Sequence, residues 1–499
     1  MFELILGVAA VVLFIIYVTG RYNEAYWIKR NVKFYPRNKF AGVIADFLTQ
    51  DKAFFEHFYE IYKEYENEPA IGIGGLMTPT LYIIDPINIQ HVLSTDFNSF
   101  NHRGIIFNES DLLANNLLLL NGHRWKLMRQ NMTPLFTATK LKSMYYIVDK
   151  SAKDFIDHLK SKPELLKGNV FDTLSSFCSA AIGAAVFGVG TTSIFDSPFL
   201  TMAQESVAPS TINNIKFSIS NTSSTLFKLF NMKFFAQHEK FFIGAIKHII
   251  QERKRENIKK HDFADICVSL QKNGKLIDKE TGLVLEPTDE LLAAQAFFFF
   301  IAGVEPTASA IFATLFELGR NPEYLEKLHK EIDEAFIKND NQINYNVVCN
   351  MAYLDMTLNE AMRIHTPVAF LSRKCVKDTV LPVGNIKIDK GTKIFTPIFE
   401  VHHDKRYFED PEVYKPERFS PENKHKIADI TFMPFGKGNR ICVGMRYATL
   451  QVKAGLIYLL HNFTVKTIIK EGGMKYSKQQ FQVRLENVDL ELVPRCAHE

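Results

Sequence analysis

Residues 435–444 read FGKGNRICVG and combine a phenylalanine, three glycines, an arginine and a cysteine. The spacing F-x-x-G-x-R-x-C-x-G is expected by chance on the order of once in ten million positions at average composition. A cysteine that only fills a core position needs neither the glycines nor the arginine. The stretch therefore predicts a loop built around the sulfur of Cys442.

The chemistry of this loop indicates a haem iron bound by a thiolate. A cysteine thiolate gives electron density to the iron and favours cleavage of the O–O bond. Glycines let backbone N–H groups turn toward the sulfur, which helps to keep it deprotonated. Arg440 places a positive charge two residues away, suited to a haem propionate. We predict that Cys442 binds the metal and that Phe435 shields the sulfur from water.

The composition is that of a globular protein with a sizeable core. Of the 499 residues, 46% are hydrophobic and 23% are charged, and the net charge is +4. Because this charge is mild and no zinc-finger spacing occurs, nucleic acid is a poor candidate for a partner. The six cysteines form no C-x-x-C pair, which favours reduced thiols in the cytosol over a disulfide framework.

The start of the chain predicts a membrane anchor. Residues 4–18 are nearly all apolar, and four basic residues follow by position 33. This order differs from that of a cleaved signal peptide. By the positive-inside rule it keeps the rest of the chain in the cytosol. We predict an anchor over residues 1–20 and one haem-thiolate catalytic domain over residues 21–499. A buried core helix is the alternative for the apolar run.

Helical patterns far outnumber strand-like runs. The expected helices cover residues 54–65, 123–136, 141–159, 234–259, 289–319, 324–336 and 353–363. The expected strands cover residues 80–84, 393–397 and 488–493. The fold class is therefore predicted as mainly α, with small peripheral β-sheets.

The expected helix over residues 289–319 is apolar on every face, so it should be buried in the middle of the protein. It contains Gly303, Glu305 and Pro306, which are poor choices for a helix that only has to pack. Such breaks of a local rule in a core element are expected at functional positions.

Taken together, these features resemble the cytochrome P450 family, in the family's order along nearly the whole chain. The landmarks besides the Cys442 loop are W-x-x-x-R at Trp125 and Arg129, the segment AGVEPT at 302–307, E-x-x-R at Glu360 and Arg363, and PERF at 416–419. The resemblance implies the P450 fold: a helical haem domain with small sheets and an N-terminal membrane anchor.

The resemblance also implies the cofactor and the residues around it. The cofactor would be haem b, with Trp125, Arg129, Arg373 and Arg440 near its propionates. In the family, the E-x-x-R pair and the arginine of PERF, here Arg418, form an ion triad that stabilises the fold. E-x-x-R is not diagnostic alone, because it recurs in this chain at 252–255 and 317–320. We interpret Glu360, Arg363 and Arg418 as structural.

This sequence departs from the family at the oxygen site. The family places a threonine directly after the acid, whereas Pro306 follows Glu305 here and Thr307 comes one residue later. One residue turns a helix by ~100°, so Thr307 cannot occupy the same point. Proline also leaves the carbonyl of Ala302 without its usual N–H donor. We predict Glu305 and Thr307 as catalytic residues that act with an ordered water. The alternative is a helix that merely bends.

Membership of this family implies partners. No dinucleotide or flavin fingerprint is present, so NADPH-cytochrome P450 reductase would supply electrons, with cytochrome b5 as a further donor. The substrates would be dioxygen and a lipophilic small molecule, and the protein would lie on the cytoplasmic face of the endoplasmic reticulum membrane. A basic dock for the reductase is expected from Arg124, Lys126, Lys437 and Arg446.

The segments expected to contact substrate by family position are mostly apolar: 103–118, 297–304, 368–371 and 481–482. Four consecutive phenylalanines at 297–300 suggest an aromatic wall, although at least half of these rings should pack inward. The overall pattern resembles insect microsomal members that detoxify xenobiotics. Two alternatives stay open: an oxygen-independent isomerase or dehydratase of peroxides, motivated by Pro306, and a non-enzymatic haem sensor.

Overall fold

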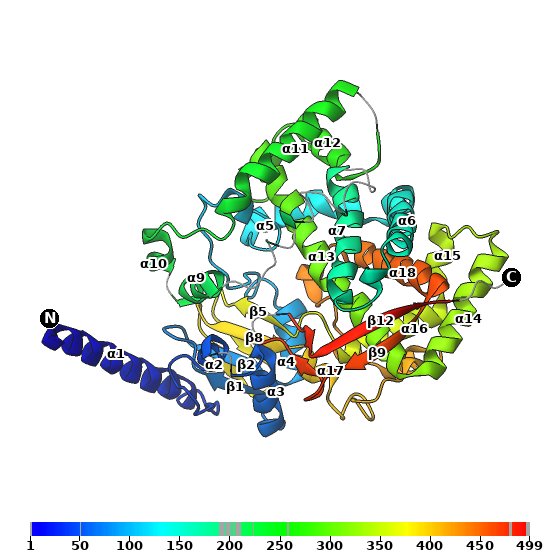
Figure 1. Cartoon of the computed structure of the whole chain (residues 1–499). Helices are drawn as coiled ribbons and strands as arrows, with labels where there is room; N and C mark the ends of the chain where they lie inside the picture. Colours follow the sequence, from blue (N-terminus) through cyan, green and yellow to red (C-terminus); the bar gives the residue numbers. More distant parts are fainter. Residues whose placement is uncertain are drawn as a thin grey trace.

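Helices form most of the computed structural model, which describes residues 2–49, 51–188, 195, 201–202, 205, 211–222, 224–256, 259–478 and 482–495 (Figure 1). The helices are α1 (Phe2–Ile28), α2 (Val43–Thr49), α3 (Phe54–Glu64), α4 (Pro86–Gln90), α5 (Gly122–Met132), α6 (Ala138–Ser161), α7 (Val170–Phe187), α9 (Thr211–Thr222), α10 (Ser224–Leu229), α11 (Ala236–Glu256), α12 (Phe263–Asn273), α13 (Asp289–Arg320), α14 (Pro322–Lys338), α15 (Tyr345–Cys349), α16 (Ala352–Ile364), α17 (Phe399–His402) and α18 (Met445–Asn462).

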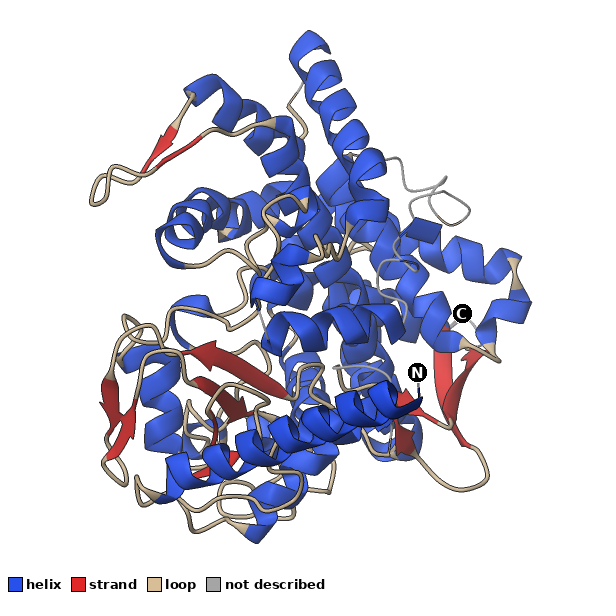
Figure 2. Ribbon diagram, turned by 90° about the vertical axis from the view of Figure 1, so that its left-hand side faces the viewer, coloured by secondary structure: helices blue, strands red, loops and turns tan. Residues whose placement is uncertain are grey.

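The strands are short and lie at the edges of the helical body (Figure 2). They are β1 (Ala70–Ile73), β2 (Thr80–Ile83), β3 (Leu276–Ile277), β4 (Val284–Leu285), β5 (Phe370–Lys374), β6 (Thr379–Leu381), β7 (Ile386–Ile388), β8 (Lys393–Pro397), β9 (Phe463–Ile469), β10 (Lys475–Tyr476), β11 (Leu485–Glu486) and β12 (Val488–Pro494). The prediction of a mainly α fold with small peripheral sheets is confirmed.

Helix α13 passes through the centre of the helical body (Figure 1). The hydroxyl of Thr288 caps its first turn by accepting from the N–H of Leu291 at 3.2 Å. Most of its 32 residues are buried, as its apolar faces predict, and the helix continues without a break through Pro306. It packs against α7, α11, α16 and α18. These four helices fix the position of α13.

Two buried helices were missing from the sequence prediction. Nearly every residue of α7 is buried, and α18 is also largely buried. Both helices bury residues on several sides, and α18 buries even polar ones such as Gln451 and Lys453, so no single apolar stripe marks them in the sequence. Both helices pack against α13, and α18 starts directly after the Cys442 loop.

One four-stranded sheet lies beside a second, smaller core. Its strand order is β1-β2-β8-β5, with β2 and β8 parallel and the other neighbours antiparallel. Side chains such as Phe58, Tyr82 and Phe395 fill the core next to it. Because β5 belongs to this sheet, the sheet fixes the backbone of Arg373.

Helix α1 projects from the body and has the properties of an anchor (Figure 1). Among the described residues, three helical segments are long and apolar enough to cross a membrane: Leu6–Ile28, α7 and α13. The two latter helices are buried in the protein, whereas Leu6–Ile28 is mostly exposed. The end of α1 docks on the body, where Asn23 Nδ2 donates to the carbonyl of Leu76 at 3.0 Å. The division at residue 20 stays a prediction.

Candidate active site

Glycines and one backbone hydrogen bond shape the loop that carries Cys442. Gly436 and Gly438 have φ angles of +75° and +72°, in the left-handed region that favours glycine. A Cβ atom at Gly438 would lie 1.9 Å from the carbonyl oxygen of Leu93. The N–H of Cys442 donates to the carbonyl oxygen of Phe435 at 3.0 Å. The loop therefore turns back on itself and presents the cysteine at its end.

The Cys442 sulfur lies among groups that favour a thiolate. Its side chain is accessible. Protein packed around it raises the pKa of the thiol by desolvation, while the N–H of Gly444 and the guanidinium groups of Arg129 and Arg103 act to lower it. The positive end of the α18 dipole begins three residues later, at Met445. A metal ion adds its own charge and removes the proton from a coordinating thiol.

Four arginines form a cluster around this loop, which we call the arginine cluster: Arg103, Arg129, Arg373 and Arg440. Burial lowers the pKa of each of them, and neighbouring members lower the pKa of Arg103, Arg373 and Arg440 further by repulsion. The Nε atoms of Arg103, Arg373 and Arg440 are buried and have no hydrogen-bond partner in the part of the chain that the structure describes. None of the ion pairs found within the described ranges involves a member of this cluster.

Contacts from α5 and the loop before it hold Arg440 in place. Its Nη2 donates to the carbonyl oxygen of Leu120 at 2.9 Å and to Oδ1 of Asn121 at 3.1 Å. Its guanidinium carbon lies 4.3 Å from the ring centre of Trp125, in cation–π geometry. Arg129 lies one turn further along α5 and acts on the same sulfur. The structure thus brings the residues predicted to bind haem to one place.

The arginine cluster fits the two propionates of a haem. Buried positive charges are costly unless negative groups compensate them. Guanidinium groups bind carboxylates with short, charge-assisted hydrogen bonds. The cluster offers several such donors beside an accessible thiol, which is the donor set that a thiolate-bound haem requires.

Arg103 was predicted to lie in a substrate-contact segment, 103–118, whereas the structure makes it a member of the arginine cluster. The structure ties its loop to β5, because the hydroxyl of Ser372 donates to the carbonyl oxygen of Arg103 at 2.8 Å. Its Nη2 reaches the carbonyl oxygen of Arg440 at 3.4 Å, across 337 residues of sequence. A single arginine in an irregular loop gives no periodic signal, so only tertiary structure identifies it.

The ion triad predicted from E-x-x-R and PERF is present. Arg363 donates two hydrogen bonds to the carboxylate of Glu360, both of 2.8 Å. Arg418 Nε donates to the same carboxylate at 3.1 Å, and the N–H of Lys415 adds a fourth donor at 3.0 Å. Arg363 also donates to the carbonyl of His402 at 2.8 Å. This triad is saturated by groups of the chain itself, which agrees with a structural role.

One face of α13 is accessible near its middle. Ala302 is exposed, and Phe298 and Pro306, four residues before and after it, are partly exposed. Residues four apart share a helix face. Thr307 is buried, consistent with the ~100° turn that separates it from Pro306. The structure therefore does not place Thr307 on the face of Ala302 and Pro306, and its catalytic role stays a prediction.

Three of the four consecutive phenylalanines pack inward. Phe297 and Phe300 contact the ring of Phe242 in α11, and Phe299 contacts Phe136. All three are buried, whereas Phe298 is partly exposed on the face of Ala302. A single ring, not a wall of four, is thus presented on this side of α13.

Glu305 is buried beside Pro306 and points toward the C-terminal part of the chain. Its Oε1 lies 3.7 Å from Nη1 of Arg484 and has no hydrogen-bond partner among the described residues. Desolvation raises the pKa of this carboxyl, Arg484 lowers it and Asp172 raises it. No sequence motif indicated that Arg484 or Asp172 would approach the oxygen site.

The structure supports only in part the segments predicted to contact substrate and the basic residues predicted to dock the reductase. Phe481 lies outside the described residues, while Gln482 pairs with Val368 in an isolated bridge. Three of the four cations of the predicted basic dock already pair within the chain: Lys126 with Glu280, Arg124 with Glu109 and Lys437 with Asp429. A partner would have to compete with these acids for them.

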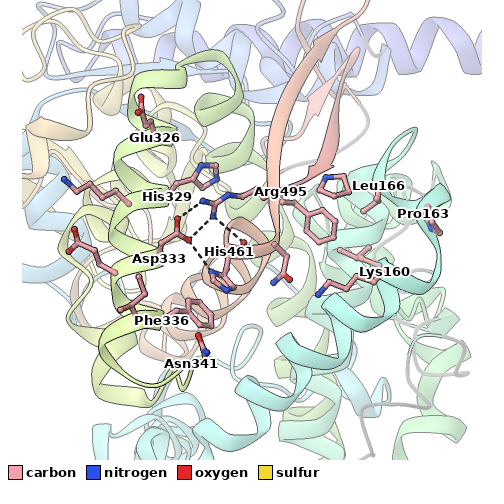
Figure 3. Close-up of a pocket in the computed structure, with 17 residues that line it drawn as sticks. Lys160, Pro163, Leu166, Glu326, His329, Asp333, Phe336, Asn341, His461 and Arg495 are labelled. Carbon is pink, nitrogen blue, oxygen red and sulfur yellow. Dashed lines mark hydrogen bonds and ion pairs between the residues drawn. The ribbon is translucent and has the colours of Figure 1, made fainter. Parts of the chain in front are cut away.

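A separate cavity of about 1050 Å³ lies away from Cys442 (Figure 3). At its centre, Arg495 Nη2 donates to Asp333 at 2.6 Å, and His461 lies 3.3 Å from the same carboxylate. His461 also stacks on Phe336. His461 is near the far end of α18, about 24 Å along the helix from Met445, where α18 begins after the Cys442 loop. Its central charges pair with one another, so we assign it no chemistry.

The cysteine loop, the arginine cluster and the central helix together define a haem-thiolate protein. Comparison with known families agrees, because the family model "Cytochrome P450" matches residues 36–491. The chain therefore belongs to the cytochrome P450 family and is a P450 monooxygenase, an oxidoreductase. A haem iron is its cofactor, and it acts with dioxygen, a redox partner and a lipophilic substrate.

The similar proteins come from insects. Cytochrome P450 9e2 of Blattella germanica is 30% identical and covers 95% of each chain. Cytochrome P450 6a2 of Drosophila melanogaster is 31% identical over 96% of each chain. Cytochrome P450 6B7 of Helicoverpa armigera is 30% identical over 93% of this chain and 92% of its own. The expected resemblance to insect members is confirmed.

Proposed function

We propose that this protein inserts one oxygen atom from dioxygen into a lipophilic small molecule, either a xenobiotic or an endogenous lipid or hormone. NADPH-cytochrome P450 reductase supplies the electrons, with cytochrome b5 as a further donor. The observation that carries the proposal is the accessible Cys442 thiol among four arginines that have no acidic partner in the described part of the chain. The relatives named above are the reason to favour xenobiotics.

We assign the residues as follows. Cys442 binds the iron of haem b, and Phe435 covers the sulfur side. Trp125, Arg129, Arg373 and Arg440 hold the propionates, and Arg103 joins them. When bound, the haem supplies the activation of dioxygen. The arginines fix its orientation and balance its charge, and the Gly444 N–H helps to keep Cys442 deprotonated.

Residues of α13 are assigned two tasks at the substrate site: they exclude water and they supply protons. Phe298 and Ala302 present an apolar surface that suits a lipophilic substrate and excludes bulk water. Proline leaves the Ala302 carbonyl free of its usual donor, so this oxygen can hold an ordered water. Glu305 supplies protons from the flank of the same face, with Thr307 as a further candidate. A general acid in this role contributes about 10²–10⁴-fold to rate.

The anchor sets the location that we propose. Leu6–Ile28 projects from the body with mostly exposed apolar side chains. Basic residues follow the apolar run, which by the positive-inside rule puts the catalytic domain on the cytoplasmic face of the endoplasmic reticulum. This is also the side where a membrane-bound reductase would be available.

A second candidate function follows from Pro306. An isomerase or dehydratase of peroxides needs no proton delivery to dioxygen, so it tolerates the missing threonine. The first test is the reduced carbon-monoxide difference spectrum, which separates a thiolate-bound from a histidine-bound haem and so also tests the sensor alternative. The second test compares turnover with reductase, NADPH and dioxygen against turnover of a lipid hydroperoxide alone. Turnover of the hydroperoxide only would overturn the monooxygenase proposal.

The variant Pro306→Thr sharpens this test. It restores both a helix N–H and a hydroxyl at the family position, so more product should form per NADPH consumed and less peroxide should escape. Haem content, measured first, controls for misfolding of the buried helix. Unchanged coupling in Pro306→Thr together with full activity in Glu305→Ala would show that α13 does not deliver protons.

A further inference from the structure

Glu305 is connected to the surface by a short series of charged groups. Glu305 on α13 is 4% exposed. The next member is the side chain of Arg484, which is 27% exposed, and the last is Asp172 on α7, which is 53% exposed. Arg484 Nη1 lies 3.7 Å from Glu305 Oε1, and its Nη2 lies 3.8 Å from Asp172 Oδ1. One guanidinium thus stands between a buried and an exposed carboxylate.

Neither contact of Arg484 is a hydrogen bond. Both distances exceed the range for an N–H···O bond, so the attraction is electrostatic and leaves the side chain free to shift toward either acid. Within the described ranges, Oε1 of Glu305 has no hydrogen-bond partner. The guanidinium lies over the ring of Phe171, 4.1 Å from its centre, in cation–π geometry.

The backbone of Arg484 is held more firmly than its side chain. Its carbonyl oxygen accepts from the N–H of Ser477 at 2.9 Å, and the preceding N–H, of Val483, donates to the carbonyl of Pro367 at 3.2 Å. Any movement between the two acids is therefore a movement of the side chain alone. Such rotamer changes are fast compared with enzyme turnover.

Helix geometry puts Glu305 at the edge of the accessible face. It follows Ala302 by three residues, which leaves about 60° between them around the helix axis. Rotation of the long glutamate side chain can therefore bring the carboxyl from Arg484 toward the face of Ala302 and Pro306. As long as Arg484 attracts the carboxylate, that rotation is opposed.

We propose that Arg484 is a positioning residue that gates proton entry at Glu305 by moving between Glu305 and Asp172. This rests on the proposed function, in which Glu305 supplies protons. Arginine keeps its own proton, so it acts by charge only. When Arg484 shifts to Asp172, the Glu305 carboxylate takes one proton from solvent. The neutral carboxyl turns to the Ala302 face, releases that proton there and returns as a carboxylate to Arg484.

Among the described residues, Arg484, Asp172 and Cys178 interact electrostatically with Glu305, and each makes a distinct contribution. Arg484, from the C-terminal segment, favours the ionised carboxyl, whereas Asp172, from α7, favours the neutral one. Cys178, also on α7, is buried, and its thiol has its pKa raised chiefly by desolvation and further by Glu305. Cys178 is therefore uncharged, and the two charged residues should shift the protonation of Glu305 in opposite directions.

The test is an infrared titration of the holoprotein, in which the band of the protonated Glu305 carboxyl is assigned by its loss in Glu305→Gln. Arg484→Gln should raise the midpoint by about one pH unit or more, the usual effect of an opposite charge at this distance. Asp172→Asn should lower it, and Arg484→Lys should restore it. Arg320→Gln is the matched control, because Arg320 also pairs with a buried glutamate of α13, Glu317.

Reconstitution with reductase and NADPH supplies a second measurement, the peroxide released per NADPH and its pH profile. In Arg484→Gln this profile should move with the infrared midpoint, while Arg320→Gln should leave it in place. Midpoints that stay unchanged in both Arg484→Gln and Asp172→Asn, or that move in the same direction, would overturn the gate. Failure of the proposed function looks different: wild-type protein would lack the thiolate spectrum, or Glu305→Gln would couple as well as wild type.

Discussion

Two groups of buried and partly buried arginines in this protein differ in whether the chain supplies an acid to balance their charge. Arg363 and Arg418 share the carboxylate of Glu360, and the hydrogen bonds of this triad are supplied by the chain itself. The arginine cluster around Cys442 has four guanidinium groups whose buried nitrogens are partly without partners, and repulsion within the cluster lowers the pKa of three of them. The first group completes the fold, and the second needs a negatively charged ligand.

The difference shows how to separate a structural arginine from a ligand-binding one. Both kinds include fully buried members and members of family motifs, so neither burial nor motif distinguishes them. What differs is whether the chain supplies the opposite charge. A buried charge without a counter-charge costs several kcal/mol, so a cluster that lacks acids indicates a charged ligand.

The largest expected effect is the loss of oxygenation when Cys442, the proposed source of the thiolate, is replaced. Cys442→His should abolish oxygenation, because imidazole lacks the electron donation of a thiolate, yet it should leave some haem bound because the arginine cluster remains. Haem content and product formation measure the two effects. Cys349→His, at an exposed cysteine, is the control. Oxygenation by Cys442→His would disprove the axial-ligand assignment.

The second-largest expected effect is a loss of stability when the ion triad of Glu360, Arg363 and Arg418 is broken. Arg363→Ala removes the partner of a fully buried carboxylate and should cost ~3–5 kcal/mol of unfolding free energy. That is a large share of the ~5–15 kcal/mol typical of a protein, so little folded protein should be recovered. Thermal unfolding and the yield of soluble protein are the measurements. Arg320→Ala, which breaks a half-exposed ion pair, should cost ~0–1 kcal/mol. Equal losses in the two variants would contradict a special role for the triad.

A substitution in the arginine cluster should affect haem binding more than it affects folding. Under the proposed assignment, Arg373→Met removes hydrogen bonds to a propionate, worth ~1.5–3 kcal/mol, and should weaken haem binding by about 10–100-fold. Unlike Arg363→Ala, it also relieves repulsion, so the yield of folded protein should hold up better. The rate of haem transfer to an acceptor protein measures the affinity, and Lys374→Met on the same strand is the control. If both variants released haem at the same rate, Arg373 would not contact the cofactor.

The smallest effect concerns a single buried acid. Glu400 is fully buried, and desolvation raises its pKa from the usual 4.5 to about 8, against smaller contributions from backbone N–H groups and Tyr82. A carboxyl with a raised folded-state pKa stabilises the fold fully below its unfolded pKa and loses that contribution as pH rises through the folded value. Between about pH 6.5 and 7.5, the stability of wild type should therefore fall by ~1 kcal/mol relative to Glu400→Gln. Denaturant unfolding at the two pH values checks this. A constant difference would mean that Glu400 ionises normally.

Much of the active site could be predicted from the sequence because its chemistry is local. Residues 435–444 carry the proposed iron ligand, the glycine turns and one arginine within ten positions. Trp125 and Arg129 lie one turn apart on the same helix face, and the apolar faces of α13 predicted that it is buried. The mainly α fold followed from helical patterns that the structure confirms. Short-range geometry decides all of these features, so the order of residues suffices.

Only the tertiary structure decided which distant residues meet. Arg103 joins Arg440 across 337 residues, and Arg484 reaches Glu305 from the C-terminal segment. The buried helices α7 and α18 gave no periodic signal, yet α7 carries Asp172. An isolated arginine has the same sequence signature on a surface, in an ion triad or beside a haem. Its role depends on which charges the packed chain brings within a few ångströms, and that depends on the whole fold.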